Sequence, residues 1–195
     1  MPATNLRRVC VFCGSSPGAR PVYLDAAAQL GRALVAGKIE LVYGGADVGL
    51  MGHLAHTVLN LGGHVIGVIP RSLVEKEVAH QNLADLRIVE TMHERKALME
   101  QLSDGFIALP GGFGTIDELA EILTWSQLGF HSKPIGLWNV EGYFDLLLQF
   151  FEHMAQEKFL KQANYELLLK DEDLGSLLEK MATYRAPFRE QLMEG

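Results

Sequence analysis

The chain has 195 residues, 48% of them hydrophobic and 21% charged, and its formal net charge is −7 at pH 7. These values are typical of a globular protein, and we expect residues 1–195 to form a single domain with a substantial core. The negative charge argues against nucleic-acid binding, so no nucleic-acid partner is expected. The apolar runs fall short of the ~20 residues of a membrane-spanning helix, so no membrane association is expected.

Short apolar segments alternate with amphipathic stretches from the N-terminus onward. The first apolar segment, 8–13, runs directly into Gly-Ser-Ser, which favours a first strand over a signal peptide. The second helical stretch ends at Gly62 and Gly63, a common way for a helix to stop. In this half of the chain, strands are expected at 8–13, 39–46 and 64–70, with helices at 23–36 and 49–62.

The second half of the chain continues the alternation after a polar segment. RIVE (87–90) is expected to be a weaker strand, and Thr91 is expected to cap a helix over 91–104 with its hydroxyl. Further strands are expected at 105–110 and 134–139, and helices at 115–128, 143–158 and 172–184, the last two separated by the apolar stretch ELLLKD.

The predicted strands are apolar at nearly every position, and most are followed by a helix. This combination indicates a parallel sheet that is covered on both faces. No linker composition or internal repeat interrupts the pattern. The sequence therefore predicts the α/β class, with one doubly wound parallel sheet and helices on both faces.

Two cysteines, Cys10 and Cys13, form a C-V-F-C pattern in the first predicted strand. This spacing occurs in redox-active pairs. In an extended strand, however, residues three apart point to opposite faces, so a disulfide would require a turn. We therefore expect two buried, reduced thiols, as is usual in the cytoplasm, where we expect the protein to reside.

Three glycine-rich turns follow predicted strands: CGSSPG (13–18), YGGADVG (43–49) and PGGFGT (110–115). In a parallel sheet such turns lie at the carboxyl edge, where ligands bind. A helix N-terminus offers unpaired N–H groups to an anion, and glycine lets the anion approach. We therefore expect a phosphate against 111–115, with the Thr115 hydroxyl at the N-cap. The other two turns add the nucleotide-loop candidates Gly14, Ser15, Gly44 and Gly45.

Two carboxylates, Asp117 and Glu118, follow the third turn directly. Acidic residues in the first turn of a helix often only complement its dipole, which suits Asp117. Glu118 lies about 300° around a helix from Thr115 and so shares its face. A carboxylate there would repel a bound phosphate unless it served a reacting centre farther along the ligand.

Several motifs together resemble the LONELY GUY family of cytokinin-activating phosphoribohydrolases, which are often described as lysine decarboxylases. PGGFGTIDE (110–118) is similar to the family signature PGGxGTxxE, and MHERK (92–96) is similar to a second motif in which an arginine and a lysine follow a Met-His pair. YGGADVGLMG (43–52) and LTWSQLGFHSKPIGLWNVEGYF (123–144) extend the likeness over nearly the whole chain.

The resemblance implies a Rossmann-like fold, a homodimer and a reaction without a cofactor. The reaction would be hydrolysis of the N-glycosidic bond of adenosine 5′-monophosphate, with or without an N6 substituent, to an adenine-type base and ribose 5-phosphate. Position by position, the resemblance assigns catalysis to Arg95 and Glu118. It assigns substrate binding to Glu77, Lys96, Gly111, Gly112, Gly114, Thr115, Asp117 and Thr124.

The residue types suit this chemistry. Breaking the bond between C1′ and the base builds positive charge on the ribose. Glu118 could stabilise that charge, attack C1′ or deprotonate water, and the sequence leaves all three roles open. Arg95 could orient Glu118, or bind the phosphate or the ribose hydroxyls through its fixed fork of donors.

Three alternative functions remain at this point. A decarboxylase would need pyridoxal phosphate on a Schiff-base lysine, and only Lys96 lies near a motif. A non-catalytic nucleotide carrier of the molybdenum-cofactor type would use the glycine turns but would have no use for Arg95 and Glu118. A broader purine or pyrimidine nucleotide nucleosidase would differ only in its base preference.

A metal site is not expected from the sequence. His53 and His56 share one helix face, but no third ligand stands beside them, so both are interpreted as ordinary helix residues. His93 is interpreted as structural.

Overall fold

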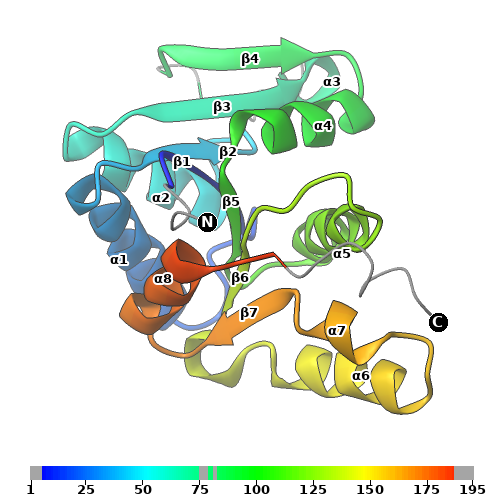
Figure 1. The fold of residues 1–195 in the computed structure, drawn as a ribbon. Helices are drawn as coiled ribbons and strands as arrows, with labels where there is room; N and C mark the ends of the chain where they lie inside the picture. The colour runs from blue at the N-terminus through cyan, green and yellow to red at the C-terminus, as the bar shows by residue number, and fades with distance from the viewer. Residues whose placement is uncertain (1–5, 75–78, 81–82, 187–195) are drawn as a thin grey trace.

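The computed structural model describes residues 6–74, 79–80 and 83–186. Within these ranges, seven parallel strands form one sheet in the order β4-β3-β2-β1-β5-β6-β7, with helices on both faces (Figure 1). The predicted α/β class and doubly wound parallel sheet are confirmed. The strands are β1 (Arg8–Phe12), β2 (Glu40–Tyr43), β3 (Val65–Pro70), β4 (Asp85–Val89), β5 (Gly105–Ala108), β6 (Ile135–Trp138) and β7 (Leu168–Asp171).

The helices follow the strands much as the periodicity predicts. Thr91 caps α4 as expected, because its hydroxyl accepts a hydrogen bond from the backbone N–H of Glu94 at 3.1 Å. The main helices are α1 (Val22–Ala36), α2 (Gly49–Asn60), α4 (Met92–Leu102), α5 (Phe113–Gln127), α6 (Asp145–Gln156) and α8 (Leu174–Thr183). Shorter helical turns are α3 (Arg71–Val74), η1 (Val140–Gly142) and α7 (Gln162–Tyr165).

The edge of the sheet differs from the sequence prediction. The stretch ELLLKD, which the sequence marks only as apolar, contains β7, and this strand pairs in parallel with β6. Its outer edge is free in the sheet order, and two of its four residues are only partly buried. A short, half-buried edge strand lacks the continuous apolar run that identifies the central strands.

Two hydrophobic clusters cover the two faces of the sheet. On one face, Val9 and its neighbours pack against α1, α2 and α8, and on the other, Phe12 and Phe106 pack against α4, α5 and α6. Cys10 lies in the second cluster and Cys13 in the first, as the strand alternation predicts. Both thiols are free and buried, and burial raises the pKa of each. They are structural thiols.

The strand order reverses at the centre of the sheet, between β1 and β5. β1 leads to β2 and β3 on one side, whereas β5 leads to β6 and β7 on the other. The crevice beyond the carboxyl ends of such strands is where ligands bind in this class of fold. The loops after the two strands touch there, since the backbone N–H of Gly14 donates to the carbonyl of Pro110 at 3.0 Å.

The turn between β2 and α2 closes onto the same crevice. Gly49 has a φ of +56°, and a Cβ atom on it would lie 2.3 Å from the carbonyl carbon of Ser15. Only glycine allows this close approach of two backbones. The N–H groups of Leu50 and Met51 then point at the carbonyl of Gly14, at 3.0 and 3.4 Å. Two of the first N–H groups of α2 therefore have a hydrogen-bond acceptor within the protein.

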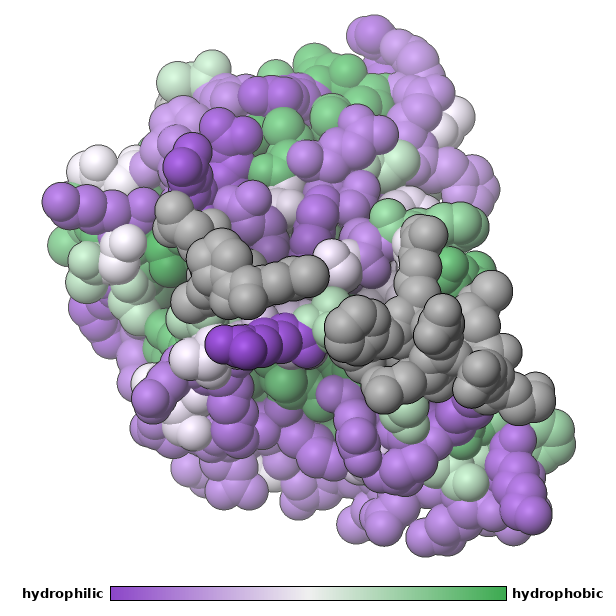
Figure 2. Space-filling view, viewed as in Figure 1, coloured by the Kyte–Doolittle hydropathy of each residue, from purple (hydrophilic) through white to green (hydrophobic). Residues whose placement is uncertain are grey.

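The surface of the molecule is mostly polar on the side shown in Figure 2. Outside the grey atoms, the face in Figure 2 is mainly hydrophilic, and its hydrophobic residues form small separate patches. Of the helices in the described ranges, none has the length and apolar character needed to cross a membrane.

Candidate active site

Arg95 lies in α4 but turns its side chain inward, so that the residue is only 7% exposed. Its Nε donates to the carbonyl oxygen of Val68 in β3 at 3.0 Å. A Cβ atom at Gly44 would lie 2.2 Å from Arg95 Nη2, so the guanidinium fits only because residue 44 has no side chain. The second glycine turn thus makes room for a buried cation.

Glu118, in α5, is the partner of Arg95. Arg95 Nη1 donates to Glu118 Oε1 at 2.6 Å, and the two side chains are 8% and 10% exposed. Burial raises the pKa of Glu118, and the charge and hydrogen bond of Arg95 oppose this shift without cancelling it. The fold therefore joins the two residues that the motifs single out, from helices on the same face of the sheet.

Lys96 forms a second connection between α4 and α5. Its Nζ lies 3.1 Å from Asp117 Oδ2 and 3.0 Å from Glu121 Oε2. Burial lowers the pKa of Lys96, but the ion pairs with Glu121 and Asp117 outweigh this effect and the pKa is raised. A lysine with a raised pKa stays charged and is a poor Schiff-base nucleophile, which argues against the decarboxylase alternative.

The N-terminus of α5 has no side-chain cap. Its N-cap is Gly112, and Thr115, which the sequence analysis placed at the N-cap, is the third helical residue and is buried. That prediction was wrong because Gly114 is a poor helix former and suggested a later start. The first N–H groups of a helix lack intrahelical partners, so this end of α5 can receive an anion.

The glycines of the third turn are of two kinds. A Cβ atom at Gly111 would lie 2.0 Å from Thr115 Oγ1 and 2.9 Å from the backbone nitrogen of Gly14, so packing requires glycine there. A Cβ atom at Gly112 or Gly114 would meet nothing within 4 Å. Packing therefore does not explain these two glycines, and the backbone at both positions is open to the cavity side of the turn.

Tyr143 is a contact that the sequence analysis did not identify. Its hydroxyl donates to the carbonyl of Gly111 at 2.7 Å and so supports the third turn from the loop after β6. Tyr143 also packs edge-on against Tyr23, with ring centroids 5.5 Å apart. The motif stretch 123–144 contains Tyr143, but no local pattern indicates a bond to a loop 32 residues away.

Two cavities meet at these turns. One, of about 240 Å³, contains the buried ion pair, and the other, of about 380 Å³, lies between the first and third turns. Ser15 and Gly112 line both, so the two form one depression at the carboxyl edge. The first is also lined by Met51, Met92, Gly114, Thr115 and Asp117, and the second by Gly14, Tyr23, Gly111 and Tyr143.

Other predicted site residues lie elsewhere. Thr124 lines a separate pocket between α5 and α6, and its hydroxyl donates to the carbonyl of Ala120 at 2.7 Å. Gly45 lines neither cavity; it has a φ of +75° and shapes the second turn. Glu77 lies outside the described residues. His93, which was not predicted as a site residue, is exposed at the start of α4.

The fold and this depression define a doubly wound α/β protein with an open depression at the switch point of its sheet, the place where ligands bind in this class of fold. Residues 51–181 match a protein-family model described as "possible lysine decarboxylase". Over 181 residues, 93% of the chain and 80% of the relative, the chain is 51% identical to a "probable cytokinin riboside 5′-monophosphate phosphoribohydrolase" of Oryza sativa subsp. japonica. Over 192 residues, 98% of the chain and 89% of the relative, it is 45% identical to a cytokinin riboside 5′-monophosphate phosphoribohydrolase of Arabidopsis thaliana.

The chain therefore belongs to the family described as "possible lysine decarboxylase". The resemblance of its motifs to the LONELY GUY phosphoribohydrolases is confirmed. Solved structures show the same fold at low identity. A molybdenum cofactor binding protein from Rippkaea orientalis matches with a TM-score of 0.68 and 23% identity, covering 91% of this chain and 96% of that one. A molybdenum cofactor carrier protein from Chlamydomonas reinhardtii matches with 0.67 and 18%, covering 97% and 99%.

The two kinds of glycine predict opposite effects of one methyl group on stability. Gly111→Ala should lower the free energy of unfolding by about 1–3 kcal/mol, because the methyl group overpacks Thr115. Gly114→Ala should raise it by about 0.5–1 kcal/mol, because alanine is the better helix former and meets no neighbour. Urea unfolding measures both values.

The same pair separates packing from ligand contact. Gly114→Ala should weaken binding of adenosine 5′-monophosphate at least tenfold in calorimetric titration although the protein is no less stable. Unchanged affinity in this variant would show that the ligand does not approach the backbone at residue 114.

Proposed function

We propose that the chain hydrolyses the N-glycosidic bond of adenosine 5′-monophosphate or its N6-substituted forms, releasing the base and ribose 5-phosphate. The observation that carries the proposal is the buried pair of Arg95 and Glu118 beside the uncapped N-terminus of α5. The names of the relatives support the same reaction class. A protein that only bound nucleotide would not need two charges removed from water at this place.

The phosphate is assigned to the N-terminus of α5, at residues 112–115. The N–H groups there carry the positive end of the helix dipole, and Gly112 and Gly114 leave the backbone open. Ser15, which lines both cavities, offers a further hydroxyl and belongs to the same proposal. The overall charge of −7 does not oppose this assignment, because the field at the helix end is local.

The ribose then lies over Glu118, one turn farther along α5. As the bond between C1′ and the base breaks, its electron pair leaves with the base and the ribose becomes cationic. Glu118 stabilises this cation and accepts a proton from the water whose oxygen bonds to C1′. The remaining O–H of that water becomes the new hydroxyl of ribose 5-phosphate. The departing base takes one proton from solvent, and Glu118 returns one proton to solvent, so the step balances. Arg95 holds Oε1 at 2.6 Å. Because the pKa of Glu118 is raised, its carboxylate is the better proton acceptor, and we favour the base role over covalent attack.

The purine is assigned to the apolar part of the smaller cavity. Met51, Leu73 and Met92 line it together with Arg95 and Glu118. Flexible methionine side chains adapt to ligands of different outline, which suits an N6 substituent. Lys96 and Asp117 connect α4 to α5 through an ion pair. Substrate binding by Thr124 and Glu77 stays a prediction from the family motif.

Product analysis tests the reaction. Wild-type protein should release free base from adenosine 5′-monophosphate and from its N6-isopentenyl form, and Glu118→Gln should lower kcat at least 100-fold, the range expected for loss of a proton-transfer group. Glu152→Gln, an exposed glutamate of α6, is the matched control and should act as wild type. Liquid chromatography of the products gives the rates.

The fold of each variant needs a separate measurement, because breaking a buried ion pair costs about 3–5 kcal/mol. Circular dichroism and thermal unfolding show whether Glu118→Gln is folded at the assay temperature. If folded wild-type protein binds both nucleotides and cleaves neither, the proposal is wrong and a non-catalytic carrier is the better account.

The pH dependence follows from the raised pKa of Glu118. The carboxylate form is the active one, so kcat/KM should fall as the pH drops through this pKa, and the acid limb should lie above the ordinary glutamate value of about 4.3. The raised pKa also affects stability. Above the ordinary glutamate pKa, Glu118 is protonated more often in the folded chain than in the unfolded chain. Its contribution to the free energy of unfolding therefore decreases as pH rises through this range. A pH–rate profile locates the limb; an inflection at or below the ordinary value would contradict the assignment.

We also propose that the chain forms a homodimer in the cytoplasm. Large apolar side chains are exposed at both ends of α5, with Phe113 96% and Phe130 72% exposed. The two buried free thiols, Cys10 and Cys13, suit a reducing compartment. The exposed phenylalanines support an association face around α5, and the thiols support the cytoplasm.

Light scattering tests the dimer. Wild-type protein should have twice the mass of one chain, and Phe130→Ser should shift the equilibrium towards the monomer because it removes apolar contact area. Phe159→Ser, which alters another highly exposed phenylalanine after α6, should leave the mass unchanged. A monomeric wild type would contradict the proposal.

A further inference from the structure

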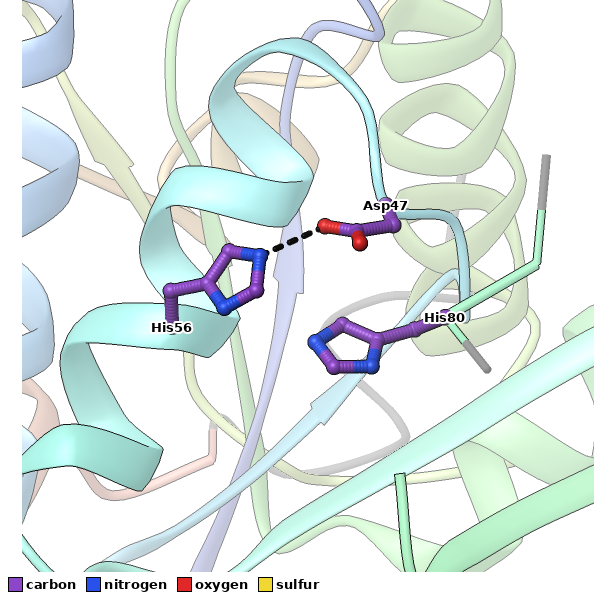
Figure 3. Close-up of side chains that lie close together, drawn as sticks. All are labelled: Asp47, His56 and His80. Carbon is purple, nitrogen blue, oxygen red and sulfur yellow. Dashed lines mark hydrogen bonds and ion pairs between the residues drawn. The ribbon is translucent and has the colours of Figure 1, made fainter. Parts of the chain in front are cut away.

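Three side chains from separate segments meet at the β2–α2 turn, outside the two cavities of the candidate active site. Asp47 belongs to that turn, His56 to α2, and His80 to the segment between α3 and β4 (Figure 3). One ligand atom from each lies within 4.8 Å of the others. His56 Nε2 lies 2.7 Å from Asp47 Oδ1, and the two imidazole rings are 4.8 Å apart, tilted by 44°. His53, one turn earlier on α2, is not part of this group.

His80 is the unusual member of the group. The residue is only 2% exposed, and neither ring nitrogen has a hydrogen-bond partner in the described ranges. A buried polar group without a partner costs about 1–3 kcal/mol, and a neutral imidazole has both a donor and an acceptor to satisfy. Figure 3 shows the ring facing Asp47 and His56. The orphaned nitrogens therefore point to a ligand between the three side chains.

The backbone of His80 is bonded to the neighbouring segment, whereas the side chains of Asp47 and His56 lie at the surface. The His80 N–H donates to the carbonyl of Gly45 at 2.9 Å, and Ala79 forms a β-bridge with Ala46. The side chains of Asp47 and His56 are 41% and 51% exposed. Two ligands of a tetrahedral zinc ion lie about 3.3 Å apart, given bonds of ~2.0 Å. Rotation of the two exposed side chains can supply this closure around a fixed His80.

We propose that Asp47, His56 and His80 bind a divalent transition-metal ion, with zinc as the best fit. Two imidazoles and one carboxylate suit zinc and cobalt, whereas calcium and magnesium prefer all-oxygen sites. Three protein ligands leave a fourth position for water. None of the three residues lines the cavities with Arg95 and Glu118, so the ion acts on structure rather than on the reaction.

The ion would join two segments that the chain separates by more than 30 residues. It would fasten the segment at His80 to the turn that contains Gly44, and Gly44 makes room for Arg95. A bound ion stabilises the folded state by an amount that grows with its free concentration. The proposal is independent of the proposed reaction, because its readout is metal binding and stability.

Calorimetric titration with Zn²⁺ and Co²⁺ tests the site, using chelator-treated full-length protein without a histidine tag. Wild-type protein should bind one ion per chain with a dissociation constant in the micromolar range or tighter. His56→Ala and Asp47→Asn, both at exposed positions, should weaken binding at least tenfold, and Zn²⁺ should raise Tm in wild type but not in these variants.

His53→Ala is the matched control, since it removes an exposed histidine from the same helix outside the group. It should keep the stoichiometry, affinity and Tm increase of wild type. Absence of binding in wild type, or equal loss of affinity in His53→Ala and His56→Ala, would overturn the proposal and leave His80 as a buried histidine that binds water.

Discussion

The ion pair between Arg95 and Glu118 is the interaction on which the rest of the site depends. Removing two charges from water costs several kcal/mol for each ion, and the mutual attraction offsets this only with good geometry and further hydrogen bonds. Here the pair is joined at 2.6 Å and the guanidinium also donates to the carbonyl of Val68. This requirement fixes α4 against α5 and against β3, and a side chain at position 44 would displace the guanidinium from this place. The site is therefore built around a pair of buried charges.

The glycine turns around this pair do different physical work. Gly49 and Gly111 are needed because two pieces of protein lie too close for a side chain, and Gly44 is needed because an arginine occupies the space. Of the glycines in these three turns that the structure describes, Gly112 and Gly114 face open space, at the uncapped N-terminus of α5. A glycine-rich turn in the sequence thus mixes packing with ligand contact, and the distances to neighbouring atoms separate the two.

The turn between β2 and α2 carries several of these constraints at once. It accommodates Arg95 on one side and approaches the backbone of Ser15 on another, while Asp47 faces His56 and His80. A segment held from three directions is a good place for a structural ion, because small displacements there would reach the buried arginine. The reaction site and the metal group that we propose are thus linked by one turn rather than by shared ligands.

The sequence by itself determined the architecture and singled out Arg95 and Glu118. Nearly continuous apolar strands alternating with helices specify a parallel sheet because both its faces must be buried, and the motifs around Arg95 and Glu118 identify the family. Local patterns were less reliable at boundaries, as β7 and the start of α5 show, because packing overrides propensity there. Only the tertiary structure decided which glycines serve packing, that Tyr143 supports the third turn, and that Asp47 and His80 lie beside His56. These contacts join residues far apart in the chain, and no periodicity or short spacing records a distance that only folding creates.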